Sequence, residues 1–222
     1  MLARTQHYGR PARRGTALDF GCGLGRLTRA LAPHFERTYG LDVASTMIER
    51  AERLDTESGR SGAVFVLHDR EDLSRYASGS VDLLSCLLVL QHLPSRDAIE
   101  GYLREFVRVL SPGGVAVVQL PVRVAPVHVP SVGYWPRLRR LLQLRTRGTR
   151  LLRAVGVSPT FLYERLGWEP KMLMSGIPYE ETVTIFETAG GRLLEASPEE
   201  AHPDGVVSRL YFVAGPETGP LP

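Results

Sequence analysis

Short apolar runs alternate along the chain with segments in which apolar side chains recur every three or four residues. From Thr16 onward, the apolar runs predict five strands: 16–20, a run that ends at Asp42, 63–67, the first part of 81–90, and 115–120. Amphipathic helices are expected between them, over 25–35, from near Thr46, and over 95–110. This alternation is typical of a parallel sheet covered by helices on both faces.

Two local signals mark the expected ends of elements. Glu49 follows Thr46 by three residues, which is the spacing of a capping box and predicts the start of the second helix. Ser111-Pro112-Gly113-Gly114 is expected to form a turn that leads into the fifth strand.

The 57 residues 121–177 are too many for a structureless loop inside a compact domain. Start signals at prolines and threonines, and a stop signal at Gly167, predict helices within this segment. We therefore expect a helical insertion or lid within one domain that covers residues 1–222. The expected fold is completed by one helix and two strands, over 178–189, 192–196 and 206–213.

Composition excludes several classes of protein. Of the 222 residues, 43% are hydrophobic and 23% are charged, which fits a globular chain and not a disordered one. No apolar run reaches the roughly 18 residues that span a bilayer, and the first residues lack an apolar signal core, so we expect a cytoplasmic protein without a membrane span. Two cysteines and six scattered histidines give no zinc-ligand pattern, so we expect no metal.

The net charge of +3 conceals an uneven distribution. Residues 106–163 hold nine arginines and no acidic residue, whereas the rest of the chain holds 18 basic and 24 acidic side chains. The basic insertion has three interpretations: a solvated charged face, a clamp for an anionic acceptor bearing phosphate or carboxylate, and a surface for nucleic acid or an anionic membrane. Since the chain has no recognisable RNA-binding module, nucleic acid is the least supported partner.

The strongest motif is ALDFGCGLG over residues 17–25, at an expected turn from strand to helix. Its glycines permit positive φ angles and a close approach of a ligand to the main chain. Because the glycines are spaced G-x-G-x-G and residue 26 is Arg, the dinucleotide pattern G-x-G-x-x-G is not met. Asp19, just before the glycines, would repel a pyrophosphate and attract a cationic amino-acid group.

Two further carboxylates follow the next strands. Asp42 closes the second strand, where a doubly wound fold places an acid on ribose hydroxyls, and Asp69 follows the third strand, at the position of an adenine edge. With Asp19 they would line one crevice at the carboxyl ends of three adjacent strands, which is where open α/β sheets bind ligands.

Five ordered segments resemble the class I S-adenosylmethionine-dependent methyltransferases. They are ALDFGCGLGRLTRALA, GLDVASTMIERA, FVLHDREDL, SVDLLSCLLVLQHLP and VRVLSPGGVAVVQLP, within residues 16–121. The resemblance implies a Rossmann-like, doubly wound sheet of seven strands with an antiparallel last strand, and S-adenosylmethionine lying across the strand ends. It also implies that the cofactor meets Asp19, Gly21, Cys22, Gly23, Arg26, Asp42, Val43, Asp69, Arg70 and the main chain near Leu87.

The chain departs from the family pattern before its first strand, and the resemblance leaves the catalytic residue undecided. Only some 15 residues precede the first strand, so we expect either that the start is truncated or that His7 and Tyr8 supply a minimal cap over the cofactor. His92 lies where the family places a segment beside the transferring methyl. Its imidazole is either a base for a substrate hydroxyl or a structural side chain at a strand end.

These features predict a methyltransferase that acts on a small-molecule acceptor, which we expect to be methylated on an oxygen. The fourth strand ends in Ser85-Cys86-Leu87-Leu88 and lacks the Asn/Asp-Pro-Pro-Tyr/Phe element of many enzymes that methylate base or glutamine nitrogens. Two alternatives remain open: an RNA or protein methyltransferase that uses the arginine-rich insertion, and a protein that binds S-adenosylmethionine without catalysis.

Overall fold

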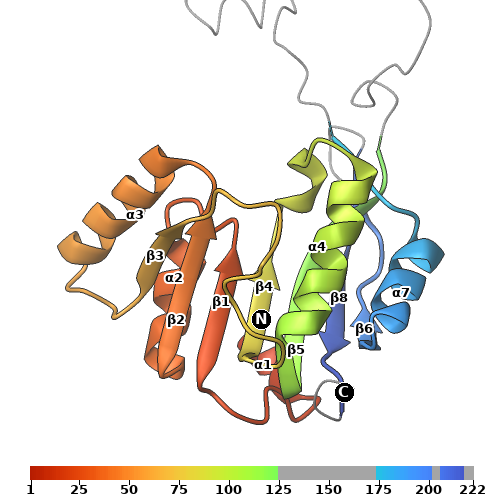
Figure 1. The fold of residues 1–222 in the computed structure, drawn as a ribbon, viewed down its shortest axis with the longest axis horizontal. Helices are drawn as coiled ribbons and strands as arrows, with labels where there is room; N and C mark the ends of the chain where they lie inside the picture. Colours follow the sequence, from red (N-terminus) through yellow and green to blue (C-terminus); the bar gives the residue numbers. More distant parts are fainter. Residues whose placement is uncertain (125–173, 202–205, 218–222) are drawn as a thin grey trace, which may run out of the picture. The chain divides into compact units, whose positions relative to one another are not determined.

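The chain is described by a computed structural model that covers residues 1–124, 174–201 and 206–217. Its centre is a mixed sheet with the strand order β3-β2-β1-β4-β5-β8-β6 (Figure 1). Five strands run parallel: β1 (Thr16–Phe20), β2 (Arg37–Asp42), β3 (Val64–Leu67), β4 (Val81–Cys86) and β5 (Leu110–Arg123).

The strands near the end of the chain add antiparallel pairings to the sheet. β8 (Val207–Ala214) lies antiparallel between β5 and β6 (Arg192–Ala196). The predicted doubly wound sheet with an antiparallel last strand is confirmed. A two-residue strand that the sequence did not predict, β7 (Glu200–Ala201), also pairs with β8.

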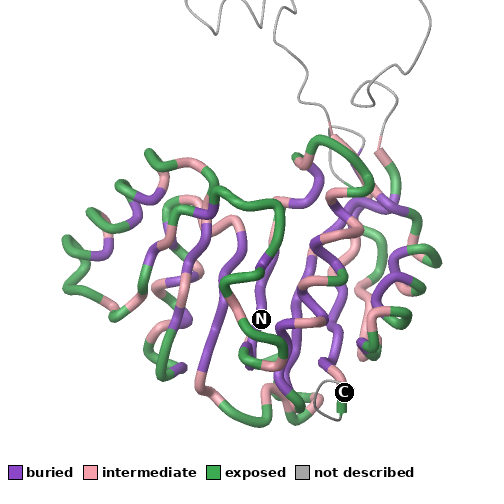
Figure 2. The backbone as a smooth tube through the Cα atoms, viewed as in Figure 1, coloured by how far each residue is buried: buried purple, intermediate pink, exposed green. Residues whose placement is uncertain are grey.

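Helices cover both faces of the sheet (Figure 1). On one face lie α1 (Leu2–Gln6), α2 (Arg26–Leu31), the short 3-10 helix η1 (Ala32–His34) and α3 (Ser45–Glu57). On the other lie α4 (Arg96–Val109) and α7 (Tyr179–Thr188). Figure 2 shows that the central strands are buried along most of their length and that α4 and α7 each bury one side.

Side chains of β1 alternate between the two faces, as the pleat of a strand requires. Leu18 and Phe20 belong to the large apolar core under α4, whereas Ala17 packs with Leu31 of α2. Asp19 lies on the same face as Ala17, so its carboxylate lies under α2 and not under α4. This alternation decides which residues of the glycine motif reach the site described below.

The N-terminal segment packs against the sheet. Tyr8 Oη donates to Glu195 Oε2 of β6 at 2.6 Å, and Arg4 forms an ion pair with the same carboxylate. Arg10 donates to the Gly114 carbonyl at 3.3 Å. Tyr8 therefore fastens the first residues to β6 and does not act as a cap over the strand ends.

Two local predictions are wrong. Thr46 and Glu49 do not form a capping box, because α3 begins one residue earlier with Ala44 as its N-cap and no side-chain cap. The Ala44 N–H donates instead to Asp42 Oδ1 at 2.9 Å, so that carboxylate fixes the entry to the helix.

The turn expected at residues 111–114 lies inside β5. Pairing of β4 with β5 shifts from Val81–Leu110 to Leu83–Val115, so the extra residues form an irregularity in a continuing strand. β5 then continues to Arg123, beyond its expected end at residue 120. The predicted helical insertion lies almost wholly within residues 125–173, which are outside the described part of the chain.

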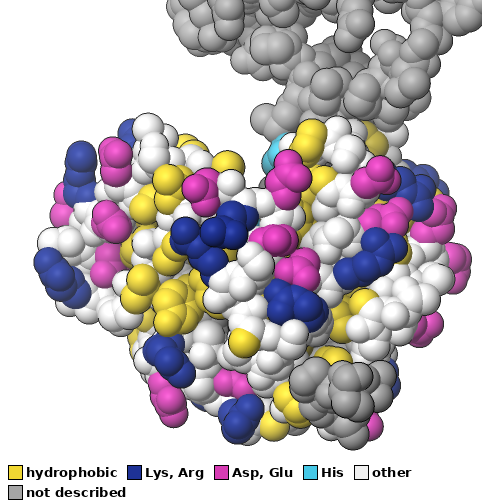
Figure 3. Space-filling view, in the orientation of Figure 1, with side chains coloured by type: hydrophobic (Ala, Val, Ile, Leu, Met, Phe, Trp, Pro, Cys, Tyr) yellow, Lys and Arg dark blue, Asp and Glu magenta, His cyan; other side chains and the backbone are white. Residues whose placement is uncertain are grey.

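Within the described ranges, the helices are too short or too polar for any of them to cross a membrane. Many arginine and glutamate side chains in these ranges form ion pairs with each other. Arg96 bonds Glu100 and Glu181, and Arg108 bonds Glu105. Figure 3 shows basic and acidic side chains mixed over the face that carries α4, in contrast to the single-sign field that a nucleic-acid surface has.

Asp82 at the start of β4 provides a test of the fold. Its buried carboxylate accepts from the N–H groups of Gly15 and Thr16 at 2.9 and 3.0 Å and from Ser111 Oγ at 2.6 Å. Asp82→Ala should lower the free energy of unfolding by roughly 3 kcal/mol in urea titrations, since each buried donor left unpaired costs about 1–3 kcal/mol.

Glu52→Ala, on the exposed side of α3, is the control and should change the unfolding free energy by less than about 0.5 kcal/mol. Equal effects of the two substitutions would contradict the role given to Asp82.

Candidate cofactor and active site

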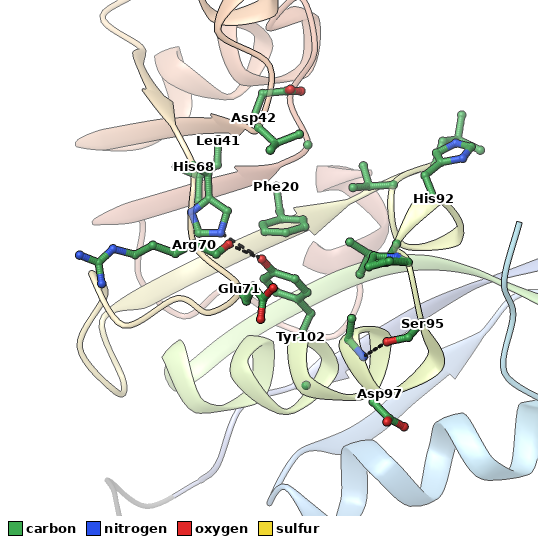
Figure 4. Close-up of a pocket in the computed structure, with 18 residues that line it drawn as sticks. Phe20, Leu41, Asp42, His68, Arg70, Glu71, His92, Ser95, Asp97 and Tyr102 are labelled. Carbon is green, nitrogen blue, oxygen red and sulfur yellow. Dashed lines mark hydrogen bonds between the residues drawn. The ribbon is translucent and has the colours of Figure 1, made fainter. Parts of the chain in front are cut away.

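A cavity of about 890 Å³ opens at the carboxyl ends of β1 to β4, on the side of the sheet covered by α4. Its wall comes from the last residues of β1 and β2, the loop after β3, the segment from Leu88 to Ser95, and the first half of α4. This size lies toward the upper end of the range of about 300–1,000 Å³ for ligand pockets. Figure 4 shows the labelled side chains around it.

The glycine turn after β1 forms one side of this cavity. The N–H groups of Gly21 and Cys22 both donate to the Leu41 carbonyl at 2.8 Å, which ties the turn to the end of β2. Gly21 has a φ of +72°, and a Cβ there would lie 2.2 Å from Val89 Cγ2. Glycine is therefore required both for the backbone conformation and for the close approach of the loop after β4.

Asp42 presents a fixed carboxylate at the same edge. Its Oδ2 accepts from the Gly23 N–H and its Oδ1 from the Ala44 N–H, both at 2.9 Å. The side chain is half-buried and lines the cavity. A carboxylate offers about four lone-pair sites, so Asp42 retains the capacity to accept from two hydroxyl groups of a ligand.

Asp19 has a different place from the one the motif suggested. Its carboxylate is buried, outside the cavity wall, and accepts from Thr28 Oγ1 and Ser85 Oγ at 2.7 Å each. Burial raises the pKa of this carboxyl, and the two hydroxyl donors partly offset that shift. Asp19 thus fastens α2 to β1 and β4 beneath the glycine turn.

The other predicted cofactor residues divide into two groups. Gly21, Val43 and Arg70 join Asp42 in the cavity wall, with Val43 77% exposed. The wall does not include the remaining predicted residues Cys22, Gly23, Arg26, Asp69 and Leu87. Burial raises the pKa of the Cys22 thiol to about 12, so that thiol is protonated at neutral pH.

His92 lies in the short 3-10 helix η2 (Leu90–His92) and lines the cavity. Figure 4 shows it at the opposite end of the cavity from His68, with Phe20 between them. Partial burial lowers the pKa of its imidazole, so the neutral form predominates at pH 7. A neutral imidazole in a ligand cavity is suited to accept a proton.

The structure adds wall residues that the motifs did not indicate. Phe20 packs with the rings of Tyr102 and His68, at centroid distances of 4.7 and 5.6 Å. Leu88 is 55% exposed in the cavity at a φ of +61°, a conformation rare for a branched side chain. The place of Phe20 as the last residue of β1, on the α4 face, was readable from the alternation of the strand, but the inward position of Tyr102 was not.

No group of three His, Cys, Asp or Glu side chains that could hold a metal ion occurs among the residues that the structure describes.

Comparison with known proteins matches the part of the chain that forms this cavity to a known family. The family model described as a methyltransferase domain matches residues 18–118, which include most of β1, all of β2 to β4 and α4, and most of β5. Residues 18–118 therefore match a methyltransferase domain. The cavity lies at the strand ends of this methyltransferase domain, with Gly21, Asp42 and His92 in its wall.

One curated relative is the ubiquinone biosynthesis O-methyltransferase of Xanthomonas axonopodis pv. citri (strain 306). It is 32% identical over 97 residues, which are 44% of this chain and 39% of that protein. The chain therefore spans about two fifths of the length of this curated relative.

Solved structures share the fold over most of the chain. Magnesium protoporphyrin IX methyltransferase from Synechocystis PCC 6803, with bound SAH, has a TM-score of 0.62 at 17% identity, covering 96% of this chain and 80% of that one. The cyclase SpnF has a TM-score of 0.63 at 15% identity, covering 98% and 80%. The same fold thus occurs in a methyltransferase and in a cyclase.

Two glycines of the turn form a matched pair for a test. Gly23 also has a positive φ, of +52°, but a Cβ there would meet nothing within 4 Å, unlike one at Gly21. Gly23→Ala should cost about 1 kcal/mol of unfolding free energy through backbone strain alone. Gly21→Ala should cost about 1–3 kcal/mol more, since overpacking against Val89 adds to the strain. Equal losses in urea denaturation would contradict the close packing of Val89 on Gly21.

Proposed function

We propose that the protein transfers the methyl group of S-adenosylmethionine to an oxygen of a small-molecule acceptor. The observation that carries the proposal is the Asp42 carboxylate, held by two main-chain N–H groups in the wall of the cavity of a methyltransferase domain. In this proposal Asp42 binds the ribose hydroxyls, and Gly21 lets the main chain approach the ligand closely.

The apolar wall fits the rest of the cofactor. Val43 and Leu88 are large hydrophobic side chains that remain 77% and 55% exposed at the cavity, where a nucleoside would cover them. S-adenosylmethionine supplies a methyl group already activated by a positive sulfur. The protein therefore has to align the two reactants and exclude water, which supplies much of the rate.

The proposed step needs one proton acceptor. A new bond forms between the acceptor oxygen and the methyl carbon as the bond from carbon to sulfur breaks, and the hydroxyl proton passes to His92. The imidazolium then returns that proton to solvent. His92 is suited to this role because its lowered pKa keeps it unprotonated at neutral pH.

The nature of the acceptor is supported by the relative's name and by the cavity charges. The curated relative is named as an O-methyltransferase, which supports an oxygen acceptor. With Asp42 assigned to the ribose, the acids Glu71 and Asp97 still outnumber Arg70 in the described wall, so this part of the site favours a neutral or cationic acceptor. An anionic acceptor would depend on the arginine-rich insertion.

A second candidate function is cofactor binding without methyl transfer. The similarity in fold to the cyclase SpnF supports it, because that likeness shows that this fold is not limited to methyltransferases. Release of the demethylated cofactor in a screen of hydroxylated, carboxylated and phosphorylated metabolites would decide between the two. An RNA or protein methyltransferase is less supported, since the face that carries α4 has mixed charge in Figure 3.

The first functional prediction concerns Asp42. Wild-type protein should bind S-adenosylmethionine and its demethylated product with micromolar affinity in calorimetry. Asp42→Asn should weaken binding about 10- to 100-fold, because hydrogen bonds to a charged group contribute about 1.5–3 kcal/mol. Asp42→Ala should weaken it further, since the N–H groups of Gly23 and Ala44 also lose their acceptor.

Glu49→Gln, on the exposed side of α3, is the control and should leave the affinity unchanged. Thermal unfolding of each variant separates lost binding from lost folding. If the folded wild-type protein bound neither compound, the proposed function would be overturned.

The second functional prediction concerns His92. With any hydroxylated metabolite that gives turnover, wild-type kcat/KM should fall as pH decreases through the lowered pKa of His92, below the ordinary value near 6.5, because only the neutral imidazole accepts a proton. His92→Gln should lose that pH dependence and about 10²- to 10⁴-fold in rate while it retains cofactor affinity. Unchanged turnover would assign His92 a structural role.

A further inference from the structure

Three side chains of α4 hold the loop that follows β3. Tyr102 Oη donates to the Arg70 carbonyl at 2.8 Å. One turn further along, Glu105 Oε2 accepts from the Leu73 N–H at 2.9 Å, and Arg108 donates to the Leu73 and Tyr76 carbonyls at 3.1 Å. The loop is therefore tied to α4 at successive points along the helix.

Only the first of these three side chains reaches the cavity. Tyr102 lines it and is 5% exposed, and its ring packs on Phe20 at 4.7 Å between centroids. Glu105 and Arg108 are outside the wall. Figure 4 shows Tyr102 reaching from α4 toward His68 and the Arg70 main chain, with Phe20 beside it.

The hydroxyl of Tyr102 also fixes His68. Its single proton goes to the Arg70 carbonyl, so at the 3.2 Å contact it accepts from His68 Nε2, which must carry hydrogen. Burial raises the pKa of Tyr102 to about 12 and lowers that of His68, so both groups are neutral at pH 7. The bond therefore selects one ring orientation and one tautomer of His68.

His68 connects this contact to the residue proposed to bind ribose. Its main-chain N–H donates to the Asp42 carbonyl at 2.8 Å, and its side chain, 7% exposed, lines the cavity beside Phe20. A shift of His68 would therefore move both the side wall of the cavity and the end of β2.

We propose that Tyr102 is a positioning residue for the nucleoside half of the cofactor, acting through His68 and the Arg70 main chain. This inference rests on the proposed function, since it assigns the end of the cavity between Asp42 and α4 to the nucleoside. Tyr102 contributes to ground-state binding of that half and not to the methyl-transfer step.

The test removes one oxygen atom. Tyr102→Phe keeps the ring on Phe20 and should raise the Kd of the demethylated cofactor and of adenosine by the same factor, about five- to twentyfold, because both share the nucleoside. The KM for S-adenosylmethionine should rise by that factor while kcat changes less than twofold. Glu105→Ala is the matched control on the same helix and loop, and should lower Tm while each Kd stays within twofold.

Each outcome decides the inference. It fails if Tyr102→Phe leaves both Kd values within twofold of wild type, if Glu105→Ala weakens binding equally, or if kcat falls in place of a rise in KM. Wild-type protein that binds neither S-adenosylmethionine, its demethylated product nor adenosine would instead overturn the proposed function, and this inference with it. The two failures are thus distinguished by the wild-type titration.

Discussion

The connection between the glycine turn and the end of β2 is the contact on which the site depends. Two N–H groups, of Gly21 and Cys22, converge on the Leu41 carbonyl, and the next residue, Asp42, accepts the Gly23 N–H with its side chain. These bonds hold the carboxylate at the cavity edge. They also bring the main chain of the turn so close to Val89 that a single methyl group at Gly21 would collide with it. The conformation of the turn and the position of the carboxylate are thus set by one local network.

Because side chains alternate along β1, one residue of the motif is buried beneath the glycine turn and the next lines the cavity. Asp19 lies under α2 and accepts from two hydroxyl donors, while its neighbour Phe20 faces α4 and lines the cavity. The acid nearest to the glycines therefore supports the turn, and the acid of the following strand, Asp42, is available to a ligand. A carboxylate in a sequence motif need not contact the ligand that the motif serves, because burial and neighbouring donors decide its role.

α4 links the two ends of the cavity. Its first half forms part of the wall, and Tyr102, Glu105 and Arg108 hold the loop after β3. Tyr102 holds the part of the loop that carries His68 and Arg70, whereas Glu105 and Arg108 hold the part around Leu73 and Tyr76. This arrangement explains how a loop without regular secondary structure presents His68 and Arg70 at fixed places.

The sequence by itself determined the order of strands and helices, the turn at Gly21 and the place of Asp42, because hydrophobic period and glycine spacing are local properties of the chain. β1 and β6 have the predicted bounds, and β2 ends at the predicted residue. Only the tertiary structure decided that Asp19 is buried, that β5 continues through Ser111–Gly114, and that Tyr102 meets His68 from a helix 34 residues away. Those outcomes depend on which side chain from a distant element arrives opposite each residue, and no pattern within a single segment contains that information.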